Sequence, residues 1–248
     1  LVRFDKHWTY NFNVAVNWLA RRRESYSKPG GILDALIGDP TKPGNKFDDQ
    51  QHRLDLTISN RVNYNLTTEA HTLNVLGLYE YNMNEFNRAF VRSIGFPSAL
   101  LTTQANAAEL TDGFTNRSRL TLVSYGVFAD YDYKQRYLLQ ASVRRDGSSN
   151  FGSDVQYGTF YSASVGWNLA KENFFQVDFI DDLKLRGSYG SVGNRLGLTN
   201  YASQGTVGFG SYPGGSSTIP DNVANPDLSW ETTTTTNIGL ELNMFNDR

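Results

Sequence analysis

Hydrophobic and polar residues alternate strictly near the start of the chain. From position 8 to position 18 the even-numbered residues are all apolar, beginning with Trp8 and ending with Trp18, and the odd-numbered residues are mostly polar. Successive side chains of an extended strand point to opposite faces. This alternation therefore predicts a β-strand with one apolar face and one polar face.

Seven later segments show the same period of two. They are 53–66, 73–81, 121–131, 137–143, 161–169, 183–189 and 230–244. In the last segment we expect Trp230 on the apolar stripe, together with Leu240 and Leu242. The sequence therefore predicts an all-β fold of about eight antiparallel strands.

The spacing of the two tryptophans in the first strand suits a membrane. Trp8 and Trp18 are ten residues apart on one face, which is about 33 Å at roughly 3.3 Å per residue. A strand tilt of about 40° turns this into a height of about 25 Å, which matches the apolar band of outer-membrane barrels. We therefore predict a transmembrane antiparallel up-and-down β-barrel rather than a solvated sheet.

The connections between the predicted strands alternate in length. The long ones are 21–50, 86–117, 146–157 and 194–229, the short ones are 67–70 and 132–135, and 171–182 is intermediate. Outer-membrane barrels have short periplasmic turns and longer extracellular loops. The alternation predicts that the first strand runs outward, the second runs inward, and 194–229 is extracellular.

Composition narrows the functional classes. The formal net charge of −2 argues against a nucleic-acid partner. The chain has no cysteine, which excludes disulfides and a cysteine nucleophile. No apolar run is long enough for a transmembrane helix. A mean hydropathy of −0.46 is still compatible with a membrane barrel, because only every second residue of its strands needs to be apolar.

Metal and cofactor chemistry has weak support in the sequence. His7, His52 and His71 are far apart and show no ligand spacing, so we expect no metal site. The segment 146–150 is rich in oxygen ligands but lacks the spacing of a calcium loop, and a turn is the expected structure. No cofactor is predicted, and calcium is left open.

Catalytic motifs are also lacking. The neighbouring carboxylates Asp48 and Asp49, like Asp181 and Asp182, would point to opposite faces of a strand and could not share a proton. The glycines in 187–193 do not have nucleotide-loop spacing. We therefore predict that the protein is not an enzyme.

Several motifs in a fixed order resemble one known family. They are SYGVFADYDYKQRYLL at 124–139, RRDGSSNFG at 144–152, GW at 166–167, ENFF at 172–175, LKLRGSYG at 183–190, NPDLSWETT at 225–233 and NIGL at 237–240. This series resembles the barrel of SusC/RagA-type TonB-linked outer-membrane transporters of Bacteroidetes. The resemblance is strong from about 118 to 248 and weaker before that.

The resemblance implies a 22-stranded barrel in the outer membrane of a Gram-negative bacterium, an N-terminal plug with a TonB box, and a SusD-like surface lipoprotein as partner. It implies TonB-dependent import of a glycan or an oligopeptide, with calcium an open possibility in such complexes. We interpret residues 1–248 as one part of the barrel, with the plug and the remaining strands absent. Asn246, Asp247 and Arg248 read like a turn.

The polar faces of the predicted strands carry charges of both signs. Alternation places these residues toward a wet lumen, where they are candidates for the substrate path or for plug contacts. They are Arg53, Asp55, Arg61, Glu80, Arg144, Lys184, Arg186, Glu231 and Glu241. The competing interpretation is that they only solvate the lumen and pair across strands.

Two other functions stay open at this stage. Eight strands can close into a small outer-membrane barrel with a structural or adhesive role and no transport activity. A soluble β-sandwich that binds a ligand would show the same alternation. The motif series and the loop lengths favour the importer over both.

Overall fold

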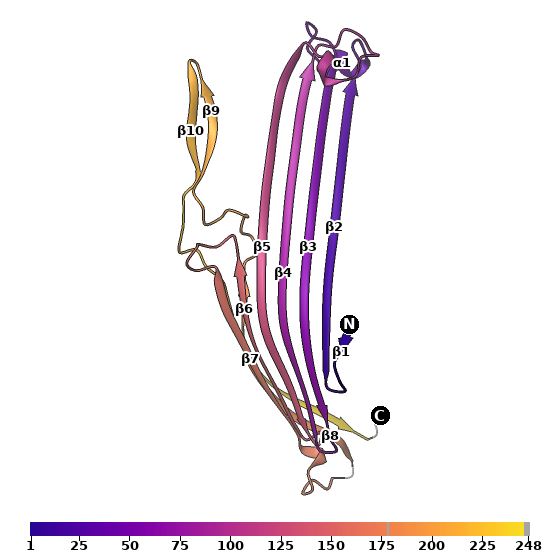
Figure 1. Cartoon of the computed structure of the whole chain (residues 1–248), viewed down its shortest axis with the longest axis vertical. Coiled ribbons are helices and arrows are strands. Elements are labelled where there is room, and N and C mark those ends of the chain that lie inside the picture. The colour runs from indigo at the N-terminus through magenta and orange to yellow at the C-terminus, as the bar shows by residue number, and fades with distance from the viewer. Residues whose placement is uncertain (178, 246–248) are drawn as a thin grey trace. The chain divides into compact units, whose positions relative to one another are not determined.

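A computed structural model describes residues 1–177 and 179–245 (Figure 1). The strands are β1 (Val2–Arg3), β2 (Trp8–Ser27), β3 (Asn45–Thr67), β4 (His71–Ile94), β5 (Glu109–Tyr133), β6 (Tyr137–Ser148), β7 (Tyr157–Asn168), β8 (Ile180–Asn194), β9 (Thr206–Tyr212), β10 (Gly215–Asn222) and β11 (Glu231–Met244). The helical segments are α1 (Ile32–Ile37), η1 (Gln104–Asn106) and η2 (Leu169–Lys171). Within the described ranges, no helix has the length and apolar character needed to cross a membrane.

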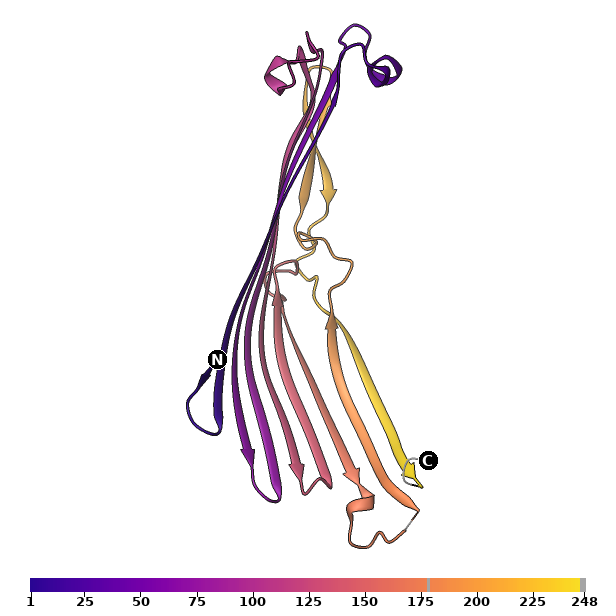
Figure 2. The ribbon, with the colours of Figure 1, turned by 90° about the vertical axis from the view of Figure 1, so that its right-hand side faces the viewer.

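The strands form a meander, as the alternation predicts. Nine of them make one sheet in the order β1-β2-β3-β4-β5-β6-β7-β8-β11, and β9 and β10 pair separately. Figure 2 shows β6, β7, β8 and β11 side by side. Cross-strand pairs join residues of one predicted stripe, as with Val143 opposite both Val127 and Tyr161. All eight predicted strands are confirmed.

Two of the predicted long connections are shorter than predicted. Parts of 21–50 and of 86–117 are strand, because β2 extends to Ser27, β3 begins at Asn45, β4 extends to Ile94 and β5 begins at Glu109. These stretches have no continuous apolar stripe, because charged residues are mixed with apolar ones, as in the run of three arginines at 21–23. Backbone ladders do not require an apolar face, so the alternation signal ends before the strands do.

The predicted turn at Asn246, Asp247 and Arg248 lies outside the described residues. The rest of the chain divides into two compact units. Unit 1 comprises Leu1–Val14, Thr57–Asn82 and Leu120–Arg248, and unit 2 comprises Ala15–Leu56 and Met83–Arg119. Strands β2 to β5 therefore contribute residues to both units.

The apolar stripe of unit 1 is exposed to the surroundings. Val127 and Val165 are 56% and 57% exposed, and Ile238 is 89% exposed. A water-soluble sandwich would bury such a stripe against a second sheet. No such layer covers it in the described part of the chain, where the buried apolar residues are Phe90, Phe96, Phe151 and Phe160. The sandwich alternative is not what the structure shows.

The ENFF motif ties β6 and β7 to the connection that follows them. The Tyr137 hydroxyl and the Trp167 indole N–H both donate to Glu172 Oε1, at 2.7 and 2.9 Å. These two hydrogen bonds, with the nearby Arg136 guanidinium, lower the pKa of the Glu172 carboxyl. Arg136 also donates to Asn173 Oδ1 at 3.0 Å. The motif is thus explained by a structural role at this turn.

Candidate binding surface

The charged residues predicted for one face of unit 1 do share a face. Lys184 lies opposite both Asn168 on β7 and Glu241 on β11. Since side chains directly opposite each other in antiparallel strands lie on the same side of the sheet, this register groups the charges. We call this side the polar face, and the side that carries Val165 the apolar face.

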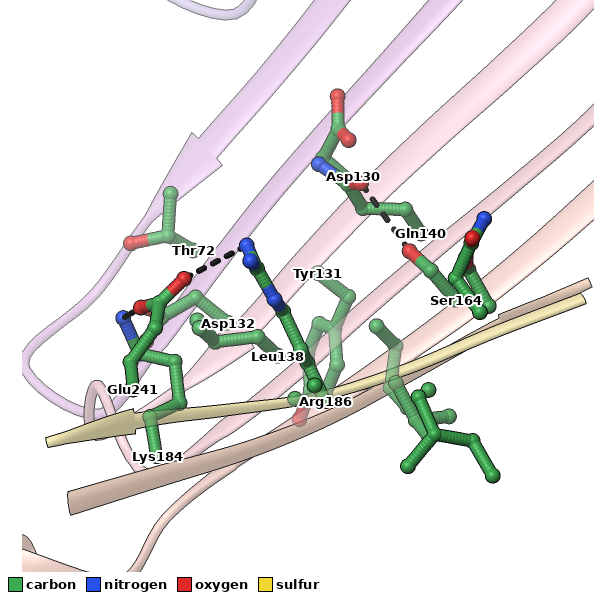
Figure 3. Close-up of a pocket in the computed structure, with 18 of the residues that line it drawn as sticks. Thr72, Asp130, Tyr131, Asp132, Leu138, Gln140, Ser164, Lys184, Arg186 and Glu241 are labelled. Atoms are coloured by element: carbon green, nitrogen blue, oxygen red, sulfur yellow. Dashed lines mark hydrogen bonds and ion pairs between the residues drawn. The ribbon is translucent and has the colours of Figure 1, made fainter.

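A pocket of about 680 Å³ lies on the polar face of unit 1 (Figure 3). We call it the Lys184 pocket. Its polar lining comes from β4, β5, β6, β7, β8 and β11, and consists of Thr72, Asn74, Asp130, Asp132, Gln140, Ser164, Lys184, Arg186, Ser188, Asn237 and Glu241. Hydroxyl, amide and charged groups of both signs therefore converge on one volume.

Glu241 joins the two basic residues of this pocket. Lys184 Nζ is 3.2 Å from Glu241 Oε2, and Arg186 Nη1 is 2.6 Å from Glu241 Oε1 (Figure 3). Gly239, directly opposite Arg186, makes this possible. A Cβ there would lie 2.7 Å from Arg186 Nε, so the arginine would have to shift if a larger residue replaced Gly239.

The other side of the Lys184 pocket carries carboxylate, amide and hydroxyl side chains. Asp132 Oδ1 accepts the backbone N–H of Gln135 at 2.7 Å, which fixes the turn between β5 and β6. Ser164 donates to Gln140 Oε1 at 3.1 Å across β6 and β7 (Figure 3). Asp130 lines the same pocket. The arrangement offers hydrogen-bond donors and acceptors to a polar solute.

A second pocket of about 540 Å³ lies on the polar face of unit 1, and we call it the Trp230 pocket. Its walls combine aromatic rings with arginines and amides, among them Phe128, Phe160, Trp230, Arg144, Asn82 and Asn194. Arg144 donates to Asp146 at 2.7 Å and to Ser124 at 3.1 Å. Arg144 therefore lines a cavity as well as bracing the strand end.

The position predicted for Trp230 is wrong. The residue precedes β11 and lies against Phe151 and Phe160, with ring centroids 4.9 and 5.5 Å away, and its indole donates to Gln156 O at 2.9 Å. Phe160 lies on the polar face, one residue out of step with the stripe of Tyr161. Outside the strand, the loop conformation sets the side-chain direction, and strand alternation no longer applies.

Glycines make room for this aromatic cluster. A Cβ at Gly193 would come within 2.1 Å of the Phe160 ring, and one at Gly158 would contact both Phe160 and Trp230 at 2.6 and 2.9 Å. Sequence reasoning missed the pocket. The glycines of the 187–193 stretch were its signal, since a glycine inside a strand often marks a close approach of another group.

The remaining predicted site residues do not converge on one point. In unit 1, Glu80 accepts from Asn82 at 2.8 Å, Glu231 accepts from Asn194 at 3.1 Å, and Arg61 is exposed. In unit 2, Arg53 Nε is 3.1 Å from Asp55 Oδ1. Their role in a substrate path stays a prediction.

The histidines have separate local partners. His7 Nδ1 is 2.7 Å from Asn65 O, His71 Nδ1 is 2.8 Å from the Tyr131 hydroxyl, and His52 packs on Trp18 with ring centroids 5.5 Å apart. Among the described residues, no three His, Cys, Asp or Glu side chains gather as metal ligands.

An open antiparallel meander with an exposed apolar face and a polar face lined by pockets defines a segment of a β-barrel. Residues 3–248 match the family described as TonB dependent receptor-like, beta-barrel. The chain belongs to this family, which confirms the predicted fold class and the resemblance to SusC/RagA-type proteins.

Curated relatives come from two bacteria. TonB-dependent receptor P39 of Formosa agariphila is 34% identical over 78% of this chain and 19% of its own length. TonB-dependent receptor SusC of Bacteroides thetaiotaomicron is 32% identical over 86% of this chain and 22% of its own length. The chain thus spans about a fifth of the length of these relatives.

Solved structures show the same fold. The RagAB peptide transporter matches 98% of this chain and 27% of its own, with 26% identity and a TM-score of 0.85. The RagAB peptide importer in the closed-closed state matches 100% and 27%, with 25% identity and a TM-score of 0.86. The strands described above are therefore similar to part of a much larger barrel.

Proposed function

We propose that this chain is part of the barrel of a TonB-dependent importer in the outer membrane, and that the whole protein takes up a glycan or an oligopeptide. The observation that carries the proposal is the family match over residues 3–248. The relatives that share the match are named as receptors, a transporter and an importer, and none is named as an enzyme.

The two faces of unit 1 support this role. Exposed valine and isoleucine side chains on the apolar face suit lipid acyl chains, because the hydrocarbon layer requires apolar residues at every second strand position. The Lys184 and Trp230 pockets on the polar face suit a wet lumen that a polar solute or a plug could contact. The mechanism needs no bond chemistry from the chain, only selective contacts along a path.

The partners follow from the same proposal. Energy would come from TonB through a plug segment, and a SusD-like surface lipoprotein would deliver the nutrient. The chain would supply lumen contacts and lipid contacts, with no cofactor of its own. Calcium at 146–150 remains a proposal, although Asp146 and Asn150 already accept hydrogen bonds there from Arg144 and Ser148.

The small closed barrel has no specific support. Strands β2 and β11 do not pair with each other in the described sheet, whose order runs from β1 to β11 without closing. Unpaired strand edges cannot face hydrocarbon, because their backbone N–H and C=O groups would lose hydrogen bonds. This open order supports a larger barrel over a small closed one.

Growth of the native bacterium tests the importer. Neighbouring reading frames that encode glycoside hydrolases would direct the choice of a glycan, and peptidases the choice of a peptide, as sole nutrient. Deletion of the full-length gene should abolish growth on that nutrient, and the full-length gene should restore it. Deletion of TonB should have the same effect. Unimpaired growth of the deletion strain would refute the proposal, while growth on glucose serves as control.

The proposed orientation has its own test. Ser216 is exposed and lies on β10, in the connection from β8 to β11. The chain has no native cysteine, so Ser216→Cys gives a single labelling site within it, and the full-length protein without this substitution is the labelling control. We expect a membrane-impermeant maleimide to label it on intact cells. Labelling only after lysis would reverse the orientation.

A further inference from the structure

Arginine and phenylalanine side chains gather on four neighbouring strands of unit 2, β2 to β5. Arg23 Cζ lies 5.4 Å from the Phe47 ring centroid, and Arg92 Cζ lies 5.8 Å from the same centroid. The Phe47 and Phe90 centroids are 4.8 Å apart, and those of Phe90 and Phe114 are 5.2 Å apart. We call this set the Arg–Phe ladder, and its members are Arg23, Phe47, Arg88, Phe90, Arg92 and Phe114.

Strand alternation places the ladder on the side of unit 2 that carries Asp55. Phe47 is an even number of residues from Asp55 on β3, and Arg23 stands in the same relation to Asn17 on β2. Asn17 Nδ2 donates to Asp55 at 3.3 Å, and Asn84 also donates to it. The ladder therefore shares a face with a cluster of carboxamides and a carboxylate.

The charges of the ladder are only partly compensated. Arg88 forms a two-point pair with Asp49, with Nε–Oδ1 and Nη2–Oδ2 distances of 2.8 and 3.0 Å. Neither Arg23 nor Arg92 has a carboxylate within ion-pair distance among the residues described. Asp112 is two residues before Phe114 on β5, so it lies on the same face as the ladder. It also forms no ion pair among the described residues.

Two guanidinium groups beside one phenyl ring repel each other unless an anion lies between or beside them. Arginine stays charged at all physiological pH values, so loss of a proton cannot relieve the repulsion. Stacking on a ring uses the flat face of the guanidinium and leaves its N–H edge free to donate. Carboxylate and sulfate groups match that edge in charge and geometry.

The phenyl rings add an apolar contact. Phe114 is 44% exposed and Phe47 is partly exposed, whereas Phe90 is buried at 6% and forms the base of the ladder. An exposed ring can contact the C–H face of a pyranose, while the amides of Asn17 and Asn84 suit hydroxyl groups. The backbone groups of β3 and β4 are used between strands, so an extended peptide would lack the main-chain partners that it commonly uses.

We propose that the Arg–Phe ladder binds an acidic oligosaccharide, with Arg23 and Arg92 holding its carboxylate or sulfate groups and Phe47 and Phe114 contacting its sugar rings. This inference rests on the proposed import function and names the substrate class for it. The charge complementarity between unpaired arginines and an anionic sugar chain is what selects this occupant.

Binding to the purified full-length transporter tests the proposal. The probes are tetragalacturonate, a sulfated galactan tetrasaccharide, a neutral galactan tetrasaccharide and a tetraglutamate peptide, each followed by titration calorimetry. The test variant is Arg23→Gln with Arg92→Gln. The matched control is Arg22→Gln. It removes an arginine that lies on the other face of β2 and pairs with Glu24. Heat-modifiable gel migration checks that each variant is folded.

We expect at least one acidic sugar to bind with an affinity that falls as salt rises, and the double variant to weaken it at least tenfold. Binding to uronate alone or to sulfate alone would identify the acidic group. Equal affinity for the neutral sugar, tighter binding of tetraglutamate, an unaffected double variant, or the same loss in Arg22→Gln would each overturn the proposal. Binding is measured here without transport, and import is tested separately by growth. If the strain grows but its transporter does not bind acidic sugars, the ladder proposal fails while the import function stands.

Discussion

The polar side of the sheet differs between the two units. In unit 1, Lys184 and Arg186 are both paired with Glu241, and loop residues fill part of the surface. In unit 2, Arg23 and Arg92 lie over the Phe47 ring without an acidic partner in the described part of the chain. The same strands β2 to β5 contribute to both units.

The difference separates two roles for lumen charges. A charge that is already paired across strands gives up most of its affinity for a passing anion, because the ligand must replace the partner. An unpaired guanidinium on a phenyl ring keeps its hydrogen-bonding edge free. Paired charges therefore form a solvated wall, and unpaired ones form a binding surface. The following predictions test each side of this contrast.

The largest expected effect concerns the assignment of faces in unit 1. Val165 lies opposite Leu139 on the apolar face and is 57% exposed, while its neighbour Ser164 lies opposite Gln140 on the polar face and donates to it. Val165→Arg should lower the free energy of unfolding in lipid vesicles by about 2–4 kcal/mol if Val165 lies near the bilayer midplane. Ser164→Arg should cost much less. Equal losses in urea titrations of the full-length protein would remove the basis of the comparison.

A steric prediction tests whether the loops of unit 1 close over its polar face. Gly152 donates its N–H to Leu228 O at 3.0 Å, and a Cβ at Gly152 would lie 1.6 Å from Pro226 O. Gly152→Ala must therefore displace backbone, which we expect to cost about 1–3 kcal/mol. The matched change Gly187→Ala meets nothing closer than 3.9 Å.

The outcome of the glycine pair is read in the free energy of unfolding and in the emission of Trp230, which packs beside this contact in the wild-type protein. We expect both to change for Gly152→Ala and neither for Gly187→Ala. If the two variants behave alike, the 225–230 segment is not held against Gly152 as described.

Some of this architecture could be predicted from the sequence and some could not. Alternation identified the strands and placed Lys184 and Glu241 on one face. The face that a side chain takes depends only on its position along its own strand, which the sequence shows directly. It ended too early at 21–23, where arginines occupy both faces. The ion pair between Lys184 and Glu241 depends on the register of β8 with β11, which no single strand encodes.

The aromatic contacts show the same limit. Trp230 followed the predicted stripe in the sequence but not in the structure, because it lies in the loop before β11. The Arg–Phe ladder brings together residues that are far apart in sequence, such as Arg23 and Phe47, in segments that we predicted to be loops. Only strand pairing could reveal that they share a surface.

A smaller effect is expected from the ion pairs of unit 1. Glu241→Gln keeps the shape of the side chain but leaves Lys184 and Arg186 without a carboxylate partner. Because the three side chains are partly exposed, the loss of unfolding free energy should be at most about 1 kcal/mol. Arg23→Gln in unit 2 should cost nothing measurable. A larger loss from Arg23→Gln would mean that its charge is compensated after all.

The same comparison predicts that Glu241→Gln creates an anion-binding surface in unit 1, because it leaves basic side chains without a carboxylate partner, as in the Arg–Phe ladder. With their partner removed, Lys184 and Arg186 should gain affinity for anionic sugars, and salt should weaken this new binding. Calorimetric titration with tetragalacturonate measures it. No gain in the variant would show that pairing does not control anion binding on this face.

The smallest effect concerns the one compensated arginine of the ladder. Asp49 lies on β3 before His52, which packs on Trp18 at the end of the predicted apolar band, so Asp49 is outside that band. The Arg88 guanidinium, through its hydrogen bonds, lowers the pKa of the Asp49 carboxyl. A lowered folded-state pKa stabilises the protein at pH values above the unfolded pKa of about 3.9, and the stabilisation is lost as pH falls through the folded value. The stability difference between wild type and Asp49→Asn should therefore be constant above about pH 5 and shrink only below about pH 4. Unfolding titrations at several pH values measure this difference, and its pH dependence should vanish when both proteins also carry Arg88→Gln. A pH dependence that persists without Arg88 would assign the pKa shift of Asp49 to another group.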